Sequence, residues 1–156
     1  MKKSLIAFAA ACAAIIAQSA SATTFPSLTT IYVGGGVRDN GGAFEAGSAT
    51  VFHCVNVSGV STSVRFLLLS NIGNVLASAT RTVVHGQTTT VSTHSTIAYV
   101  EDFNFNAGSV GEGGINIESL QSAVFCNAKT IDASTVAPIG VTLPLVRVNP
   151  HPGTVE

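Results

Sequence analysis

The chain has 156 residues, of which only 10% are charged, and its formal net charge is −1. This length corresponds to one domain that can bury a hydrophobic core of its own. The arginines are scattered singly along the chain, so no basic stripe is present that could bind nucleic acid or an anionic membrane surface.

The first 22 residues have the features of a cleaved signal peptide. Lys2 and Lys3 provide a basic start, residues 5–17 are mostly apolar, and Ala20-Ser21-Ala22 is a cleavage motif of small residues. The apolar stretch is short for a membrane span, and no stop-transfer pattern follows it. We therefore predict cleavage after Ala22, export to the periplasm or the extracellular space, and no membrane span in the mature chain.

Removal of the predicted leader leaves a domain of residues 23–156, in which residues 149–156 are expected to form an extended tail. Two lysines are lost, so 7 − 2 = 5 basic residues remain against 8 acidic ones, for a net charge of −3. Cys12 offers an alternative, because small residues also precede the lipid-bearing cysteine of bacterial lipoproteins. Ala9 stands where such signals usually have leucine, so the simpler interpretation is that Cys12 leaves with the leader.

The mature sequence is a series of short stretches rich in β-branched and aromatic residues, separated by turn residues. The three glycines at 34–36 are expected to break the first strand, and residues 37–47 to form a loop. The apolar run at 63–69 predicts a central strand covered on both faces. The expected strands are residues 28–33, 48–57, 63–69, 75–84, 88–93, 97–100, 115–119, 122–130 and 139–148.

Alternation within these stretches predicts which side chains share a face. Cys54 should face the same side as Phe52, and His53 the opposite side. Pro144 cannot donate a ladder hydrogen bond, so the last strand should be an edge strand or contain a bulge. No helical periodicity follows the leader, and the strands recur at roughly ten-residue spacing, which is typical of all-β sandwiches.

Cys54 and Cys126 are the only cysteines left after the predicted cleavage, and an exported chain allows them to form a disulfide. A cross-link over this separation would stabilise the fold by about 4 kcal/mol in the chain-entropy model. Cysteines on an early and a late strand bridge the two sheets of immunoglobulin-like domains, although the tryptophan that packs on that bridge is absent. We therefore predict an antiparallel immunoglobulin-like β-sandwich of about 7–9 strands, with one disulfide between its sheets.

Four short motifs carry a resemblance to a set of small exported bacterial β-sandwich domains of unassigned function. They are Cys54-x-Asn56, His85-Gly86-Gln87-Thr88, Gly114-x-x-Ile117-x-Ser119 and Cys126-x-Ala128. The resemblance implies a sandwich fold and a secreted setting, and it implies no activity.

Motifs of common hydrolases are absent from the sequence, which has neither G-x-S-x-G nor H-E-x-x-H. The glycine-rich stretch at 34–47 has no P-loop lysine and no helix pattern behind it, so turns explain it better than a phosphate site. We predict a protein that is not an enzyme and needs no cofactor. A ligand site, if present, is expected in the loops at 37–47 and 101–114.

Metal binding has one weak candidate. Oxygen donors at Asp102, Asn104 and Asn106 resemble the start of a calcium loop, but the glycine comes one residue late and Gly113 stands where the loop needs a glutamate. The alternative is a strand end with Phe103 and Phe105 facing the core, which the spacing favours. The histidines at 53, 85, 94 and 151 lack the close spacing of a ligand pair, so we interpret them as surface or half-buried residues.

The sequence thus favours a non-catalytic binding or structural module of the cell envelope or the extracellular space, with a protein or a glycan as its partner. An alternative comes from the resemblance of the leader, the single disulfide and the Thr/Gly/Ala/Val-rich chain to fimbrial subunits that assemble by strand exchange. The wide cysteine spacing and the C-terminus Thr154-Val155-Glu156 depart from those subunits. A calcium-binding module and a hydrolase are the remaining alternatives.

Overall fold

The computed structural model describes residues 27–42 and 44–148. The predicted signal peptide, Cys12, His151 and the predicted tail lie outside the described residues. All regular elements in the described part are strands, which confirms the all-β class. Within these residues no helix is long and apolar enough to cross a membrane.

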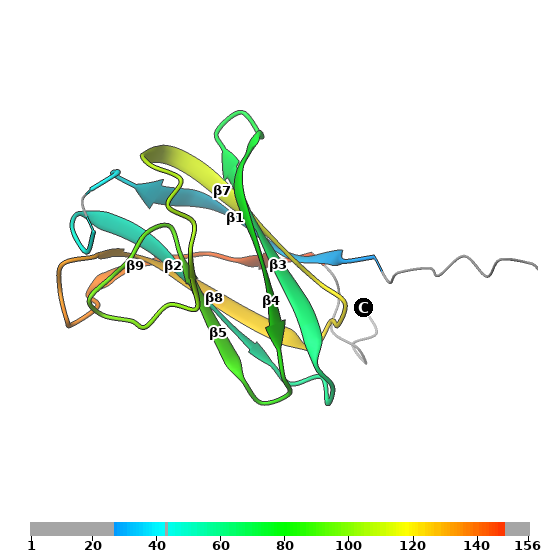
Figure 1. Ribbon diagram of the computed structural model, residues 1–156. Helices are drawn as coiled ribbons and strands as arrows, with labels where there is room; N and C mark the ends of the chain where they lie inside the picture. The colour runs from blue at the N-terminus through cyan, green and yellow to red at the C-terminus, as the bar shows by residue number, and fades with distance from the viewer. Residues whose placement is uncertain (1–26, 43, 149–156) are drawn as a thin grey trace, which may run out of the picture.

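The described residues contain ten strands in two five-stranded sheets, which lie in two layers (Figure 1). Sheet A has the order β10-β1-β7-β3-β4, and sheet B has the order β6-β5-β2-β8-β9. Neighbouring strands are antiparallel as predicted, apart from β5 and β6, which are parallel. The strands are β1 (Thr29–Asp39), β2 (Ser48–Asn56), β3 (Thr62–Ser70), β4 (Val75–Val83), β5 (Thr88–Ser92), β6 (Phe103–Asn104), β7 (Val110–Ser119), β8 (Val124–Asp132), β9 (Gly140–Leu143) and β10 (Val146–Arg147).

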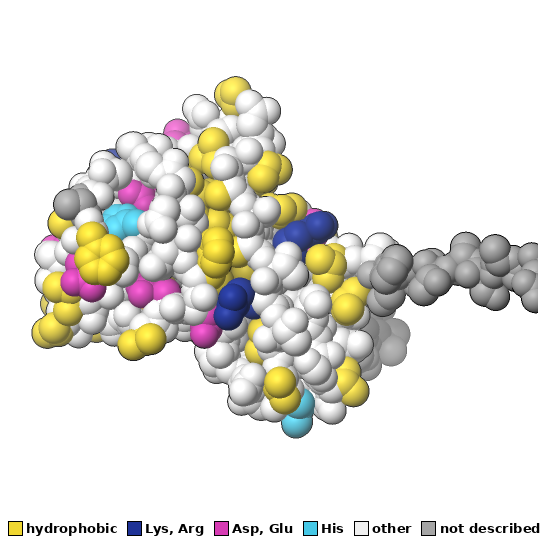
Figure 2. Space-filling view, viewed as in Figure 1, with side chains coloured by type: hydrophobic (Ala, Val, Ile, Leu, Met, Phe, Trp, Pro, Cys, Tyr) yellow, Lys and Arg dark blue, Asp and Glu magenta, His cyan; other side chains and the backbone are white. Residues whose placement is uncertain are grey.

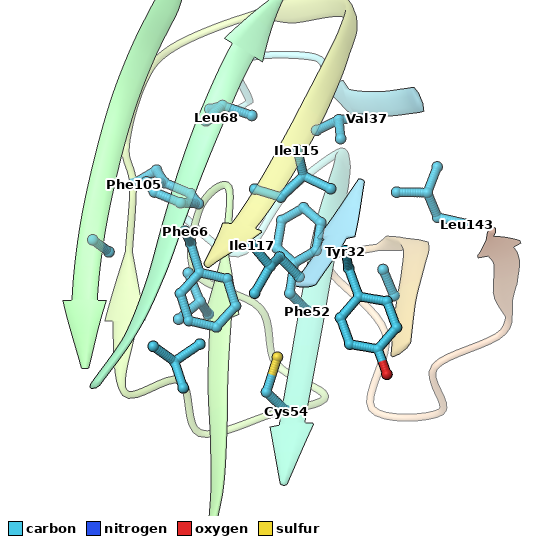
Figure 3. Close-up of a cluster of buried hydrophobic side chains, with 14 of the residues drawn as sticks. Tyr32, Val37, Phe52, Cys54, Phe66, Leu68, Phe105, Ile115, Ile117 and Leu143 are labelled. Atoms are coloured by element: carbon cyan, nitrogen blue, oxygen red, sulfur yellow. The ribbon is translucent and has the colours of Figure 1, made fainter. Parts of the chain in front are cut away.

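The core lies between the sheets and is built from alternate side chains of the central strands. Phe52 of β2 and Phe66 of β3 are fully buried, and their ring centroids are 6.4 Å apart across the layers. Figure 3 shows Ile115 and Ile117 of β7 in the same cluster. The central position of β3 is confirmed, but its second face, with Arg65 and the neighbouring leucines, is only partly covered.

The glycines at 34–36 do not break the first strand, so that prediction was wrong. β1 runs through them and pairs with β7, with Gly34 opposite Ile115 and Gly35 opposite Gly114. A Cβ on Gly34 would lie 2.8 Å from Leu145 Cδ2, and Gly36 has a φ of 86°. Small residues are therefore needed here because another part of the chain crosses β1 closely and because one residue requires positive φ.

The predicted last strand is divided between the two sheets at Pro144. β9 is the edge of sheet B, and β10 is the edge of sheet A, which confirms the prediction of edge strands in this region. Arg147 fastens β10 by donating from Nη1 to the Tyr32 hydroxyl at 2.8 Å. A strand at 97–100 was wrongly predicted: this stretch is a loop, with Val100 96% exposed. The predicted loop at 101–114 contains β6 and the start of β7.

The disulfide between Cys54 and Cys126 is confirmed, but its predicted position between the sheets was wrong. Cys54 and Cys126 lie directly opposite each other on the adjacent strands β2 and β8, with Cα atoms 4.1 Å apart. Both strands belong to sheet B. The disulfide therefore joins two neighbouring strands of one sheet. A disulfide between the sheets was the main reason for expecting an immunoglobulin-like class, and that reason no longer applies.

Candidate functional site

A buried ion pair closes one end of the sandwich. His94 Nδ1 lies 2.7 Å from Asp39 Oδ2, and His94 Nε2 lies 3.1 Å from the carbonyl oxygen of Ala46. Asp39 is 2% exposed and also accepts from the Gly41 amide at 2.7 Å. A carbonyl oxygen only accepts, so Nε2 carries a proton and is not available as the base of a Ser-His-Asp arrangement. The pair holds the loop after β1 against the loop after β5.

Thr50 forms a second polar tie between the sheets. Its hydroxyl accepts from the Arg38 amide at 3.0 Å and donates to the Arg38 carbonyl at 2.8 Å, which joins β2 to β1. Thr130 Oγ1 is 3.0 Å away and must donate, because Thr50 has already given its only hydroxyl proton. The Thr50 amide donates to Thr93 Oγ1 at 3.0 Å. The bonds between Thr50 and Arg38 therefore connect the two sheets, which the disulfide does not.

The other described histidines have separate partners. His53 Nδ1 lies 3.1 Å from Thr90 Oγ1, and its ring packs edge-on against Tyr99, whereas Cys54 faces the core as predicted. Burial lowers the pKa of His53, and the positive charge of Lys129 lowers it further. His85 Nδ1 accepts from the Gly59 amide at 3.1 Å. Among the described residues no three His, Cys, Asp or Glu side chains converge on a possible metal site.

The candidate calcium ligands take part in hydrogen bonds between β5 and the segment after it. Asp102 Oδ2 accepts from the Thr90 amide at 2.8 Å and from the Thr89 hydroxyl at 2.9 Å. Asn104 Oδ1 accepts from the Ser92 hydroxyl. The alternative prediction was a strand end with Phe103 and Phe105 facing the core. Phe105 is buried, at 8% exposed, but Phe103 is 37% exposed. Calcium binding stays a prediction, and a melting temperature unchanged by calcium would dismiss it.

Exposed apolar side chains occur on several parts of the fold, and some of them lie on an uncharged segment at the edge of sheet B. Residues 133–146 contain no charged side chain, although Asp132 and Arg147 flank them. Ile139 is 85% exposed and Val141 is 76% exposed on or beside β9, and Val136 is 79% exposed in the connection before it. Figure 2 shows hydrophobic side chains at the end of the molecule where the connection between β8 and β9 projects in Figure 1.

A hollow of about 550 Å³ adjoins this edge. Asp132 is the charged residue of its lining. Ser134 donates to the Asp132 carboxylate from both its amide and its hydroxyl. The hydrogen bond from the hydroxyl is the main reason that the pKa of Asp132 is lowered. None of the lining residues is aromatic. They are Gly47, Ser48, Thr130, Ile131, Asp132, Ile139, Gly140 and Val141.

The other three sheet edges are protected in ways that natural sheets use against unwanted pairing. β6 and β10 have two residues each and offer almost no template. β4 has nine residues and exposes Val75 and Leu76 at its start, but hydroxyl side chains at 78, 80 and 82 are exposed along the rest of it, and it carries Arg81. β9 has exposed β-branched side chains, no charge and only the flanking prolines to limit pairing, so it is the best candidate for an interaction surface.

A second hollow, of about 530 Å³, adjoins β1 and β7 of sheet A. It is lined by Val33, Gly34, Gly35, Leu69, Ile115, Pro144 and Val146. Near it on β7, Asn116 has a buried Oδ1 atom without a hydrogen-bond partner, while its Nδ2 donates to Glu118 Oε1 at 3.3 Å. The strands at this hollow, β1 and β7, pair with each other there, and β7 also pairs with β3.

The sequence-based expectation of a ligand site in the loops at 37–47 and 101–114 stays a prediction. The loop at 37–47 supplies Asp39 to a buried pair and Gly47 to the rim of the hollow at β9. The β9 edge itself was predicted only as an edge, from Pro144. The signal that could have identified it is the uncharged run between Asp132 and Arg147. Comparisons of the chain with protein-family models, with curated proteins and with solved structures gave no match.

Proposed function

We propose that this protein is an exported, non-catalytic binding or structural module that acts at or outside the cell envelope and contacts protein partners through the β9 edge. The observation that carries the proposal is the uncharged edge with Ile139 and Val141 exposed beside a hollow of about 550 Å³. An apolar edge strand left uncovered is a template for a further polypeptide strand.

The internal use of the polar side chains supports a non-catalytic role. Asp39 and His94 are buried and paired with each other, and the buried Thr50 hydroxyl donates to the Arg38 carbonyl. Asp102 accepts a hydrogen bond from the backbone of β5. A catalytic group must reach a substrate atom directly or through one water, and the side chains of Asp39, His94 and Thr50 are buried in the fold.

The disulfide supports export, because disulfides persist in oxidising compartments outside the cytoplasm. The absence of an aromatic residue from the lining of the hollow favours a protein over a glycan, since sugar rings are commonly held against aromatic faces. We keep the immunoglobulin-like class as part of the proposal on the strength of the two packed five-stranded sheets.

The proposal is tested with immobilised mature chain, residues 23–156, exposed to envelope and extracellular fractions of the producing bacterium. We expect the wild type to retain an identifiable protein that Val141→Lys loses. Val75→Lys is the matched control, because Val75 is 57% exposed on the edge strand of the other sheet, and it should retain that protein. Turnover in a broad hydrolase screen that disappears when His94 is replaced in a folded variant would contradict the proposal.

Assembly by strand exchange is the second candidate, and the same exposed edge favours it. Each strand of the described fold already has a ladder partner within its own sheet, so exchange would require one strand to leave its place. Size-exclusion chromatography separates the candidates, because exchange would give a ladder of species that resists dilution.

A further inference from the structure

We propose that the partner of the β9 edge is the β9 strand of a second copy of this chain, paired antiparallel about a two-fold axis through Val141. This inference rests on the proposed function and names the occupant of the same edge. Sheet B of one molecule would then continue into sheet B of the other. Such a contact is isologous, so the same residues serve on both sides.

The positions of the two prolines support this register. Pro138 and Pro144 each lie three residues from Val141. In an antiparallel pair centred on Val141, Pro138 lies opposite Pro144 of the second copy, so the residues that cannot donate meet at both ends of the ladder. The residues between the prolines can then pair, except through the Ile139 amide, which donates to the Ala137 carbonyl at 2.7 Å. A longer partner strand from another protein would meet a proline at both ends of β9.

The side chains of this register are also compatible with one another. Ile139 would lie opposite Leu143 of the second copy, and Gly140 opposite its Thr142, so neither a like charge nor an unpaired charge enters the contact. Pairing would remove Ile139 and Val141, now 85% and 76% exposed, from water. The largest exposed apolar side chains of this edge therefore lie at the proposed contact.

The backbone of β9 is held in position for such a contact before any partner arrives. It pairs with β8 from Ala128 to Ile131, and a Cβ on Gly140 would lie 2.4 Å from the carbonyl oxygen of Thr130. Gly140 thus keeps β9 close to β8, and β9 is already extended along the edge of sheet B. A contact of five residues is small, so the dimer is expected to be weak and concentration-dependent.

Cross-linking through a single introduced cysteine tests the register. In Val141→Cys the two new thiols would face each other, in the arrangement that already permits the native bond between the opposed residues Cys54 and Cys126. We expect mild oxidation to convert most of this variant to a covalent dimer. Ile139→Cys is the control on the same edge: its position is more exposed, but it faces Leu143 of the second copy, so it should cross-link at least tenfold more slowly. Equal rates for both variants would overturn the register.

The molar mass of the uncross-linked protein tests the contact itself. By light scattering over a concentration series, the wild type and Val75→Lys should shift from monomer towards dimer, and Val141→Lys should stay monomeric. A wild type that is monomeric at all concentrations would overturn this inference while leaving the proposed function open to its own capture test. A ladder of larger species would instead support strand exchange, and a dimer that survives Val141→Lys would place the contact elsewhere.

Discussion

The closed end of the sandwich and its open β9 edge adjoin, yet they are built from opposite chemistry. At the closed end, buried His94 pairs with Asp39, and the buried hydroxyl of Thr50 binds the backbone of Arg38, so polar groups join the sheets. At the open edge, Ile139 and Val141 are exposed without a charged neighbour from 133 to 146. In a chain with so few charges, the polar groups fasten the fold, and the exposed apolar residues indicate where a partner binds.

Removal of the disulfide should have the largest effect on the closed structure. We expect the Cys54→Ala, Cys126→Ala double variant to lose about 4 kcal/mol of unfolding free energy, because the bond restrains an unfolded loop of 72 residues. Urea unfolding of the mature chain measures the loss. A loss below about 1 kcal/mol would show that the ladder between β2 and β8 is sufficient to hold sheet B.

Replacement of Asp39 should rank second. Asp39→Asn removes the charge that faces His94 Nδ1 at a site only 2% exposed, and loss of one partner of a buried pair costs about 3 kcal/mol or somewhat more. Arg65→Gln is the control, since Arg65 pairs with Glu118 on the outer face of sheet A, where its side chain is 41% exposed. That change should cost about 1–3 kcal/mol, less than Asp39→Asn, because water can replace the exposed Arg65 side chain although Glu118 itself is 11% exposed. Similar losses for both variants, measured by urea unfolding, would remove the distinction between the two pairs.

Thr50→Val should have a smaller effect that separates hydrogen bonding from packing. The methyl groups of valine fill the same space, but the amide and the carbonyl of Arg38 lose their partner, at a cost of about 1–3 kcal/mol.

At the open edge, Ile139→Thr should change stability by less than about 0.5 kcal/mol. Thermal and urea unfolding of both variants would test whether the two regions differ as described, and a larger loss for Ile139→Thr would reverse the comparison.

Local patterns in the sequence were sufficient for some features and silent about others. Alternation identified β2 and the inward direction of Cys54, because side-chain direction in a strand depends on adjacent residues. The path of β1 through the glycines could not be foreseen, since it depends on pairing with β7 and on the close passage of Leu145. The sheet in which the disulfide lies follows from the order of strands, which no local pattern specifies.

The candidate sites show the same limit. Asp39 and His94 are 55 residues apart, and nothing near either one predicts that they meet. The β9 edge could be predicted in part. Pro144 indicated an edge strand, and the sequence shows no charged residue between Asp132 and Arg147. Exposure decides whether such a run belongs to the core or to a contact, and exposure depends on the arrangement of the whole chain.

The smallest expected effect concerns His53, which lies on sheet B outside both regions. Burial, with a further contribution from Lys129, lowers its pKa below the usual 6.5 in the folded chain, so the unfolded chain binds the proton more readily. Neutral His53 therefore contributes to the free energy of unfolding above its pKa in the unfolded chain, and this contribution is lost as the pH falls below about 6.5. Because the ring is only half-buried, the loss should be modest. Urea unfolding at about pH 7.5 and about pH 5 should show a smaller decrease in stability for His53→Gln than for the wild type. Identical decreases would show that His53 is not the source of the acid sensitivity.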